Sequence, residues 1–134
     1  RPDLAIHKFI KAILKGESIT MYGTGSTSRD YTYIDDIVQG VVNAIEYSQS
    51  DFEIINLGNN YSISLIELIQ GIEKVTGIKA VIQQLPEQPG DVPKTFADIT
   101  KAKRLLGYNP ATELTVGLQK FYDWFRANEG LLLA

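Results

Sequence analysis

The stretch GTGSTSRDYTYIDD, residues 23–36, decides how this chain is interpreted. Gly23 and Gly25 open it like a phosphate-binding glycine loop. A dinucleotide-binding fingerprint, however, needs a third glycine and a helix that starts at once. Here the third position is Ser28, and a strand-like run, residues 30–33, comes before any helix can begin. We therefore interpret the glycine loop as a turn and not as a dinucleotide site.

Hydrophobic spacing on both sides of this stretch predicts helices. Asp3 can cap the first one, and Ser64 with Glu67 has the spacing of a capping box. In chain order, helices are predicted over residues 3–15, from Asp35, over 64–76, from Asp98 through Leu106 and from Thr112. The second of these should bury an apolar stripe made of Ile37, Val38, Val41 and Ile45.

Short strands are predicted between the helices. Residues 18–22 alternate like a half-buried strand, with Ile19 and Met21 on one face. Besides residues 30–33, strands are expected over 52–58, as a buried strand, and over 79–85. The sequence thus predicts about four helices and four short strands in one domain, residues 1–134, of mixed α/β or α+β class.

Composition excludes several classes of protein. Thirteen basic and sixteen acidic residues give a net charge of -3 without a basic run, which argues against nucleic acid as a partner. There is no cysteine, no cluster of metal ligands and no apolar run of membrane length, so we expect a soluble, cytoplasmic protein without a metal. The chain does not start with methionine, and we expect it to be part of a longer protein.

Two residues suit an anionic, sugar-bearing ligand. The guanidinium of Arg29 can hold two phosphate oxygens at once, although a surface arginine paired with Asp30 or Glu17 is the alternative. Asp91 follows a Pro-Gly turn, which can hold its carboxylate rigidly to accept hydrogen bonds from sugar hydroxyls. A turn aspartate that bonds its own backbone is the alternative there.

Other polar residues are given structural roles. Asp35 and Asp36 lie at a helix start, where capping and stabilisation by the helix dipole explain them better than a shared ligand. His7 is the only histidine, lies between apolar positions, and is interpreted as structural or exposed. With no cysteine and no well-placed histidine, a nucleophilic triad is excluded.

The segments SRDYTYIDDIVQGV, residues 28–41, and PGDVPKTFADITKAKRLLGY, residues 89–108, together resemble nucleotide-sugar epimerases and dehydratases of the extended short-chain dehydrogenase/reductase family. The resemblance covers almost the whole chain and is to the carboxyl-terminal part, most of all that of UDP-glucose and UDP-glucuronate 4-epimerases. It implies a small substrate-binding portion that lacks most of the Rossmann domain.

The resemblance also implies a division of labour. The missing Rossmann domain would bind NAD and carry the catalytic tyrosine and lysine, and it would form most of a homodimer contact. The sugar C4 would be oxidised transiently and reduced on its other face. No tyrosine of this chain has a lysine four residues later, so no catalytic and no cofactor-binding residue is expected here. The chain alone should neither bind NAD nor turn over a UDP-sugar.

Five residues are assigned to the substrate site, three of them because they match family positions: Arg29, Asp91 and Tyr22. Arg29 would contact the UDP phosphates, and Asp91 the ribose. Tyr22 would line the uracil site, and Tyr31 could reach the sugar or the phosphate. Gln88 departs from the family pattern, because many members have a phosphate-binding arginine there.

These residues leave several functions open. A UDP-glucose 4-epimerase is the leading interpretation. QPGDVP, residues 88–93, resembles some UDP-glucuronate 4-epimerases instead, and a 4,6-dehydratase is a further alternative. A different class is a non-catalytic module that binds nucleotides or proteins. Without its partner domain, the chain should expose apolar surface and self-associate.

Overall fold

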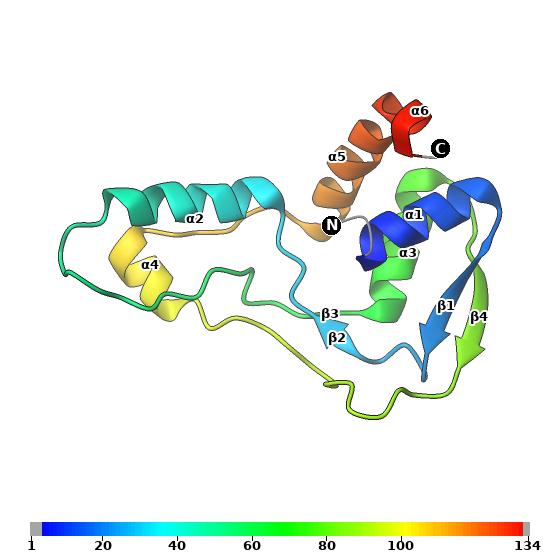
Figure 1. Ribbon diagram of the computed structural model, residues 1–134, viewed down its shortest axis with the longest axis horizontal. Helices are drawn as coiled ribbons and strands as arrows, with labels where there is room; N and C mark the ends of the chain where they lie inside the picture. The colour runs from blue at the N-terminus through cyan, green and yellow to red at the C-terminus, as the bar shows by residue number, and fades with distance from the viewer. Residues whose placement is uncertain (1–3, 133–134) are drawn as a thin grey trace.

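The computed structural model describes residues 4–132 and shows a mixed α/β fold (Figure 1). In chain order the elements are α1 (Ala5–Lys15), β1 (Ser18–Tyr22), β2 (Ser28–Arg29), α2 (Ile34–Glu46), β3 (Ile63–Ser64), α3 (Leu65–Thr76), β4 (Val81–Leu85), α4 (Thr100–Leu106), α5 (Leu114–Ala127) and α6 (Glu129–Leu132). The predicted fold class is confirmed. The expected cap Asp3 lies outside the described residues.

Three of the helices, α1, α3 and α5, surround one core together with β1, β3 and β4, and we call this part the large lobe. Its fully buried side chains come from opposite ends of the chain, as Ile10 of α1 and Phe125 of α5 show. β1 contributes Ile19 and Met21 from one face, as its alternation predicts. The remaining buried members are Ile13, Ile63, Leu68, Ile69, Ile72 and Leu118. Each such side chain contributes about 1.5–3 kcal/mol by leaving water.

Two parallel strands lie along one side of this lobe (Figure 1). β1 and β4 pair from Ser18↔Val81 to Tyr22↔Leu85, and α3 lies between them in sequence. α3 begins with the predicted capping box, because the Ser64 hydroxyl accepts from the Glu67 N–H while the Glu67 carboxylate accepts from the Ser64 N–H. Local sequence signals thus place the helix that connects the paired strands.

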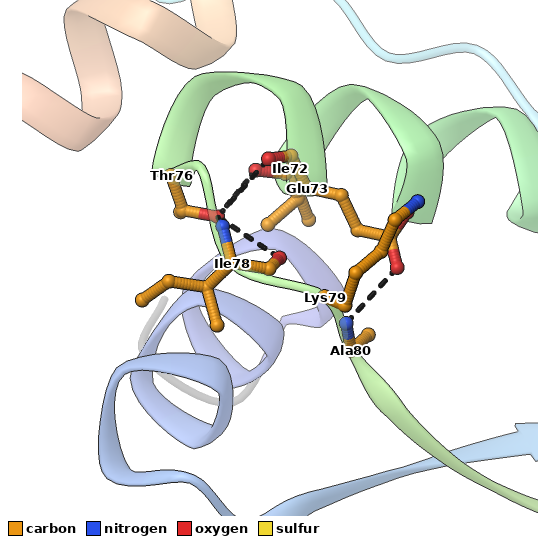
Figure 2. A network of polar contacts seen from close by, with 6 residues as sticks. All are labelled: Ile72, Glu73, Thr76, Ile78, Lys79 and Ala80. Atoms are coloured by element: carbon orange, nitrogen blue, oxygen red, sulfur yellow. Dashed lines mark hydrogen bonds and ion pairs between the residues drawn. The ribbon is translucent and has the colours of Figure 1, made fainter.

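Side-chain hydrogen bonds fix the connection from α3 to β4 (Figure 2). The Thr76 hydroxyl donates to the Ile72 carbonyl at 2.8 Å and accepts from the Ile78 N–H at 3.3 Å. The Glu73 carboxylate accepts from the Ala80 N–H at 2.9 Å. These contacts turn the chain tightly after the helix, so that β4 starts beside β1.

The second part of the molecule, which we call the small lobe, contains α2, α4 and the segments 47–60 and 95–110. Its core is formed by Ile99, Ala102, Leu106 and Tyr108. α2 approaches this core closely at Gly40, where an added Cβ would lie 2.9 Å or less from side-chain atoms of Leu57 and Tyr108. Figure 1 shows α2 along the edge of the molecule with α4 on one side of it.

Two strand predictions are wrong. Residues 30–33 are not a strand: β2 stops at Arg29, because the Asp30 carboxylate then binds backbone N–H groups of another loop. Residues 52–58 are not a strand either, since no described segment pairs with them, and Phe52 is 78% exposed. Among the described residues, polar contacts hold only the ends of that segment, at Glu53 and at Gly58.

The predicted buried stripe of α2 is also wrong for most of its members. Val38 is 49% exposed and Ile45 is 79% exposed, and Val41 is exposed as well. The helix buries its narrow Gly40 side instead, because Tyr108 and Leu57 pack there. The helix has the expected amphipathic spacing, but its apolar side has no cover among the described residues.

Candidate functional site

Backbone pairing on both sides of β2 holds Arg29 in place. β2 pairs antiparallel with β3, with Arg29 opposite Ile63. On the other side, the Ser28 N–H donates to the Pro93 carbonyl at 2.9 Å, and the Thr95 N–H donates to the Ser28 carbonyl at 3.1 Å. The loop that follows β1 therefore delivers Arg29 to the segment that contains Asp91.

The two residues meet as an ion pair. Arg29 Nη2 donates to Asp91 Oδ1 at 2.6 Å, and Nη1 donates to the Ser28 carbonyl at 2.9 Å. Both side chains stay accessible, at 33% and 41% of their surface. An ion pair this exposed stabilises the fold by at most about 1 kcal/mol. It therefore positions the guanidinium but does not prevent it from binding another anion. The predicted alternative partners, Asp30 and Glu17, are not its partners in the structure.

A turn places Asp91 opposite Arg29. The Asp91 N–H donates to the Gln88 carbonyl at 3.2 Å, and Gly90 between them has φ of 84°. Pro89 followed by a glycine with positive φ is typical of a type II turn. Gln88 is exposed at the start of this turn. The carboxylate of Asp91 binds Arg29 rather than its own backbone, so the turn presents it toward the guanidinium.

The two tyrosines lie in different surroundings. Tyr22 ends β1 and is 37% exposed. Tyr31 packs against the large-lobe core, and this burial raises the pKa of its phenol, while the nearby Arg29 acts in the opposite direction. No hydrogen bond or ion pair between described residues joins either tyrosine to Arg29 or Asp91. The structure thus brings Arg29, Asp91 and Gln88 together, with Tyr31 close to Arg29.

Sequence reasoning missed the role of Asp30. Its carboxylate accepts from the N–H groups of Asn59 at 2.9 Å, Asn60 at 3.1 Å and Ala97 at 3.0 Å. The Thr32 hydroxyl also donates to it at 3.0 Å. Asp30 therefore joins the Arg29 strand to two segments of the small lobe. The only sequence signal was its place next to Arg29, because its partners lie far along the chain.

A wide cleft of about 490 Å³ opens beside Asp30. It is lined by Asp30, Thr32, residues 55–58 and residues 95–97. None of the five predicted substrate-binding residues lines it. The cleft and the Arg29–Asp91 pair are therefore separate features, connected through the Arg29–Asp30 backbone.

Other polar residues behave differently from the predicted caps. Asp36 accepts from the N–H groups of Ala111 and Thr112, at 3.3 and 3.1 Å, and α2 has no side-chain cap. The expected capping by the two aspartates is therefore wrong, because Asp36 accepts hydrogen bonds from the loop before α5 instead. Both lie in the first turn of α2, where the helix dipole favours a negative charge, as expected. His7 lies beside the Phe125 ring, with both ring nitrogens buried and without a hydrogen-bond partner among the described residues. Its predicted structural role is confirmed.

Two further properties concern the described residues as a whole. Within residues 4–132, no three histidine or acidic side chains gather into a group that could bind a metal ion. No helix there combines the length and the apolar character that crossing a membrane requires.

Known proteins match this chain over nearly its full length. The profile of the GDP-mannose 4,6 dehydratase family matches residues 2–121. A UDP-glucuronate 4-epimerase of Thermodesulfobacterium geofontis is 38% identical over 133 residues, which is 98% of this chain and 41% of that protein.

Solved structures give the same result. The Bacillus cereus UDP-glucuronic acid 4-epimerase in complex with UDP-glucuronic acid and NAD has a TM-score of 0.87 at 39% identity, covering 95% of this chain and 41% of that one. The Thermotoga maritima UDP-glucose 4-epimerase with UDP-glucose has a TM-score of 0.85 at 32% identity, covering 92% and 40%. The chain therefore spans about 40% of the length of the relatives it matches.

Proposed function

The chain belongs to the GDP-mannose 4,6 dehydratase family, and from this premise we propose that it is the UDP-sugar-binding, carboxyl-terminal portion of an NAD-dependent 4-epimerase acting on UDP-glucuronate. The observation that carries the proposal is the Arg29–Asp91 pair. The two residues are 62 positions apart, yet their side chains meet at 2.6 Å on an accessible surface. A nucleoside diphosphate has the matching chemistry, because its phosphates and its ribose are adjacent.

Each residue has a distinct task in this proposal. The Arg29 guanidinium binds phosphate oxygens through N–H groups, and the Asp91 carboxylate accepts hydrogen bonds from the ribose hydroxyls. The type II turn fixes the position of Asp91. Its carboxylate therefore stays in place when a diphosphate replaces it as the partner of the guanidinium. Gln88 offers an amide donor beside this position, and Tyr22 and Tyr31 supply aromatic surface for the base and the sugar.

NAD does not fit the residues of this chain. The glycine loop after β1 runs into β2, and α2 starts only at Ile34. No helix amino terminus therefore follows the glycines, as a dinucleotide site requires. Bound NAD would supply the hydride acceptor from the region that precedes this chain. The residues of this chain would bind the nucleotide part of the substrate.

The choice of sugar is based on two observations. The relatives named above include UDP-glucuronate 4-epimerases at 38% and 39% identity, and a UDP-glucose 4-epimerase at 32%. Gln88 also fits the QPGDVP pattern that resembles UDP-glucuronate epimerases. The sequence placed UDP-glucose first; these observations favour UDP-glucuronate and leave UDP-glucose as the second candidate.

Titration of UDP into the protein that includes the NAD-binding region tests the nucleotide site. We expect Arg29→Ala and Asp91→Ala each to weaken UDP binding roughly 10- to 150-fold, since a hydrogen bond to a charged group is worth about 1.5–3 kcal/mol. Arg126→Ala is the matched control, because Arg126 also pairs with a carboxylate but on α5. Unchanged affinity in both site variants would refute the proposed site.

An epimerisation assay tests the sugar. The protein that joins this chain to its NAD-binding region should convert UDP-glucuronate to its C4 epimer faster than UDP-glucose. A preference for UDP-glucose would restore the second candidate. The 134 residues alone should show no turnover.

A further inference from the structure

The parallel pair of β1 and β4 leaves one edge of β4 without a partner. Within residues 4–132, β4 pairs only with β1, in a sheet of two strands, and no further backbone hydrogen bond reaches residues 81–84. Figure 1 shows β4 outside β1, at the margin of the molecule. A strand edge of this kind presents N–H and C=O groups that can pair with another strand.

The side chains of β4 also suit a strand that has room for a neighbour. Val81 is 60% exposed, and Ile82, on the opposite face, is 45% exposed. The two glutamines that follow them are exposed as well. β1 supplies Ile19 and Met21 to the large-lobe core, whereas β4 supplies no buried residue. β4 therefore exposes β-branched residues on both faces.

The usual protections of a strand edge are missing from β4. Natural edge strands carry charged residues, prolines or bulges that prevent pairing with another chain. The sequence AVIQQL, residues 80–85, has neither a charge nor a proline, and β4 pairs with β1 without a bulge. Lys79 and Pro86 lie immediately outside this sequence. They limit a new partner to the length of β4 but leave its edge open.

The sequence around β4 is complementary to itself in one register. Gln83 is the central residue of β4, and Lys79 and Glu87 lie four positions before and after it. In an antiparallel pair of two β4 strands centred on Gln83, Lys79 of each copy therefore faces Glu87 of the other, and Val81 faces Leu85. A parallel pair in register would place like charges opposite each other, which is unfavourable.

Both charged residues are accessible for such a contact. The side chain of Lys79 is 89% exposed, although its ammonium pairs with Glu73 at 2.7 Å. Glu87 is exposed, with its side chain beside Gly23. Because exposed ion pairs stabilise a fold only weakly, Lys79 can change its partner when a second copy approaches.

We propose that the free edge of β4 pairs antiparallel with the β4 edge of a second copy of this chain, about a two-fold axis at Gln83. The contact joins two sheets of two strands into one sheet of four strands. A two-fold contact uses the same surface of both copies, as this register requires. Five residues from each copy make a small interface, so the association is weak and depends on concentration.

This contact goes beyond the proposed function and uses none of the proposed substrate-binding residues. It is also separate from the homodimer contact that the family resemblance places in the preceding region. Where that homodimer forms, pairing through β4 would join homodimers into larger assemblies.

Cysteine cross-linking tests the register. In the proposed pair, Gln83 lies directly opposite Gln83 of the second copy, with Cα atoms about 4.5–5.5 Å apart. A disulfide needs about 4.4–6.8 Å between Cα atoms. Gln84 lies diagonally across from Gln84 of the second copy, at about 7–8 Å, which is too far for a disulfide. This chain has no cysteine of its own to compete with an introduced one.

The two variants should therefore behave differently in the protein that includes the NAD-binding region. Mild oxidation of Gln83→Cys should give a disulfide between two position-83 peptides, detected by mass spectrometry, with a yield that rises with protein concentration. Gln84→Cys is the matched control, because it changes an exposed glutamine of the same strand, and should give far less. Equal yields from the two variants, or no link from Gln83→Cys, would overturn the proposal.

Charge reversal tests the ends of the contact in the same longer protein. Lys79→Glu and Glu87→Lys should each raise the dissociation constant of the contact several-fold in sedimentation equilibrium, and the double variant should recover the parent value. Lys8→Glu, at an exposed lysine of α1, is the control and should leave it unchanged. A double variant as weak as the single ones would overturn the proposal. No substrate is involved, so a failed UDP titration would leave both tests valid.

Discussion

The large lobe and the small lobe differ in how their cores are closed. The core of the large lobe consists of ten buried residues from α1, β1, α3, α5 and β3, whereas the core of the small lobe consists of four. The small lobe depends instead on polar anchors, above all Asp30 and the Tyr108 hydroxyl. This difference shows that the small lobe depends more on single polar contacts than the large lobe does, and that its apolar core alone closes less of it.

Removing a large side chain from the closed core should have the largest effect. Phe125 is fully buried, so Phe125→Ala should lower the free energy of unfolding by about 3–5 kcal/mol. Phe52→Ala is the matched change in the small lobe, where the ring is exposed, and should stay within about 0.5 kcal/mol. Urea unfolding followed by Trp124 fluorescence measures both. Similar losses in the two variants would contradict the difference between the lobes.

Removing the anchor between the lobes should have the next largest effect. Asp30→Ala leaves three backbone N–H groups without their acceptor, and we expect a loss of about 2–3 kcal/mol. Hydrogen exchange should show the loss at residues 59, 60 and 97 before it reaches α3 or α5. Asp123→Ala is the control, because among the described residues Asp123 accepts only from Gln119 on its own helix. A uniform loss of protection would mean that the lobes unfold as one unit.

A cap substitution should cost less and stay in the large lobe. Ser64→Ala removes the acceptor for the Glu67 N–H at the start of α3, and we expect a loss of about 1 kcal/mol. Thermal unfolding by circular dichroism measures this loss. Exchange at residues 59, 60 and 97 should remain as in the parent protein, which contrasts with Asp30→Ala.

The smallest expected effect is a pH dependence of the same cap. Hydrogen bonds from the Ser64 hydroxyl and N–H hold the pKa of Glu67 below its ordinary value of 4.5. Because the folded-state pKa is the lower one, this stabilisation is present above pH 4.5 and is lost as the pH falls through the folded-state pKa. Glu67→Gln should flatten the stability curve in this acidic range. An unchanged curve would show that the cap does not contribute.

The parts of the fold that the sequence predicts correctly depend on local signals. The Ser64–Glu67 box and the turn at Gly77 involve residues a few positions apart, so the pattern itself specifies the geometry. The strand over residues 52–58 was predicted from an apolar run, but no described segment pairs with it. The apolar pattern describes only the segment itself, whereas a strand forms only where another segment pairs with it.

The candidate site was only half predictable for a similar reason. Family resemblance selected Arg29 and Asp91, yet nothing in their spacing indicates that their side chains meet at 2.6 Å. Asp30 was missed because its acceptor role depends on Asn59 and Ala97, which fold back from distant positions. Contacts of long sequence separation had to come from the structure.

The packing of His7 against Phe125 has a consequence for biosynthesis. These rings lie 5.3 Å apart, but 118 positions separate them along the chain. During synthesis α1 is made before α5, and non-local contacts of this kind slow folding because a long loop must close before they form. The apolar side of α1 therefore lacks this cover until α5 has been synthesised.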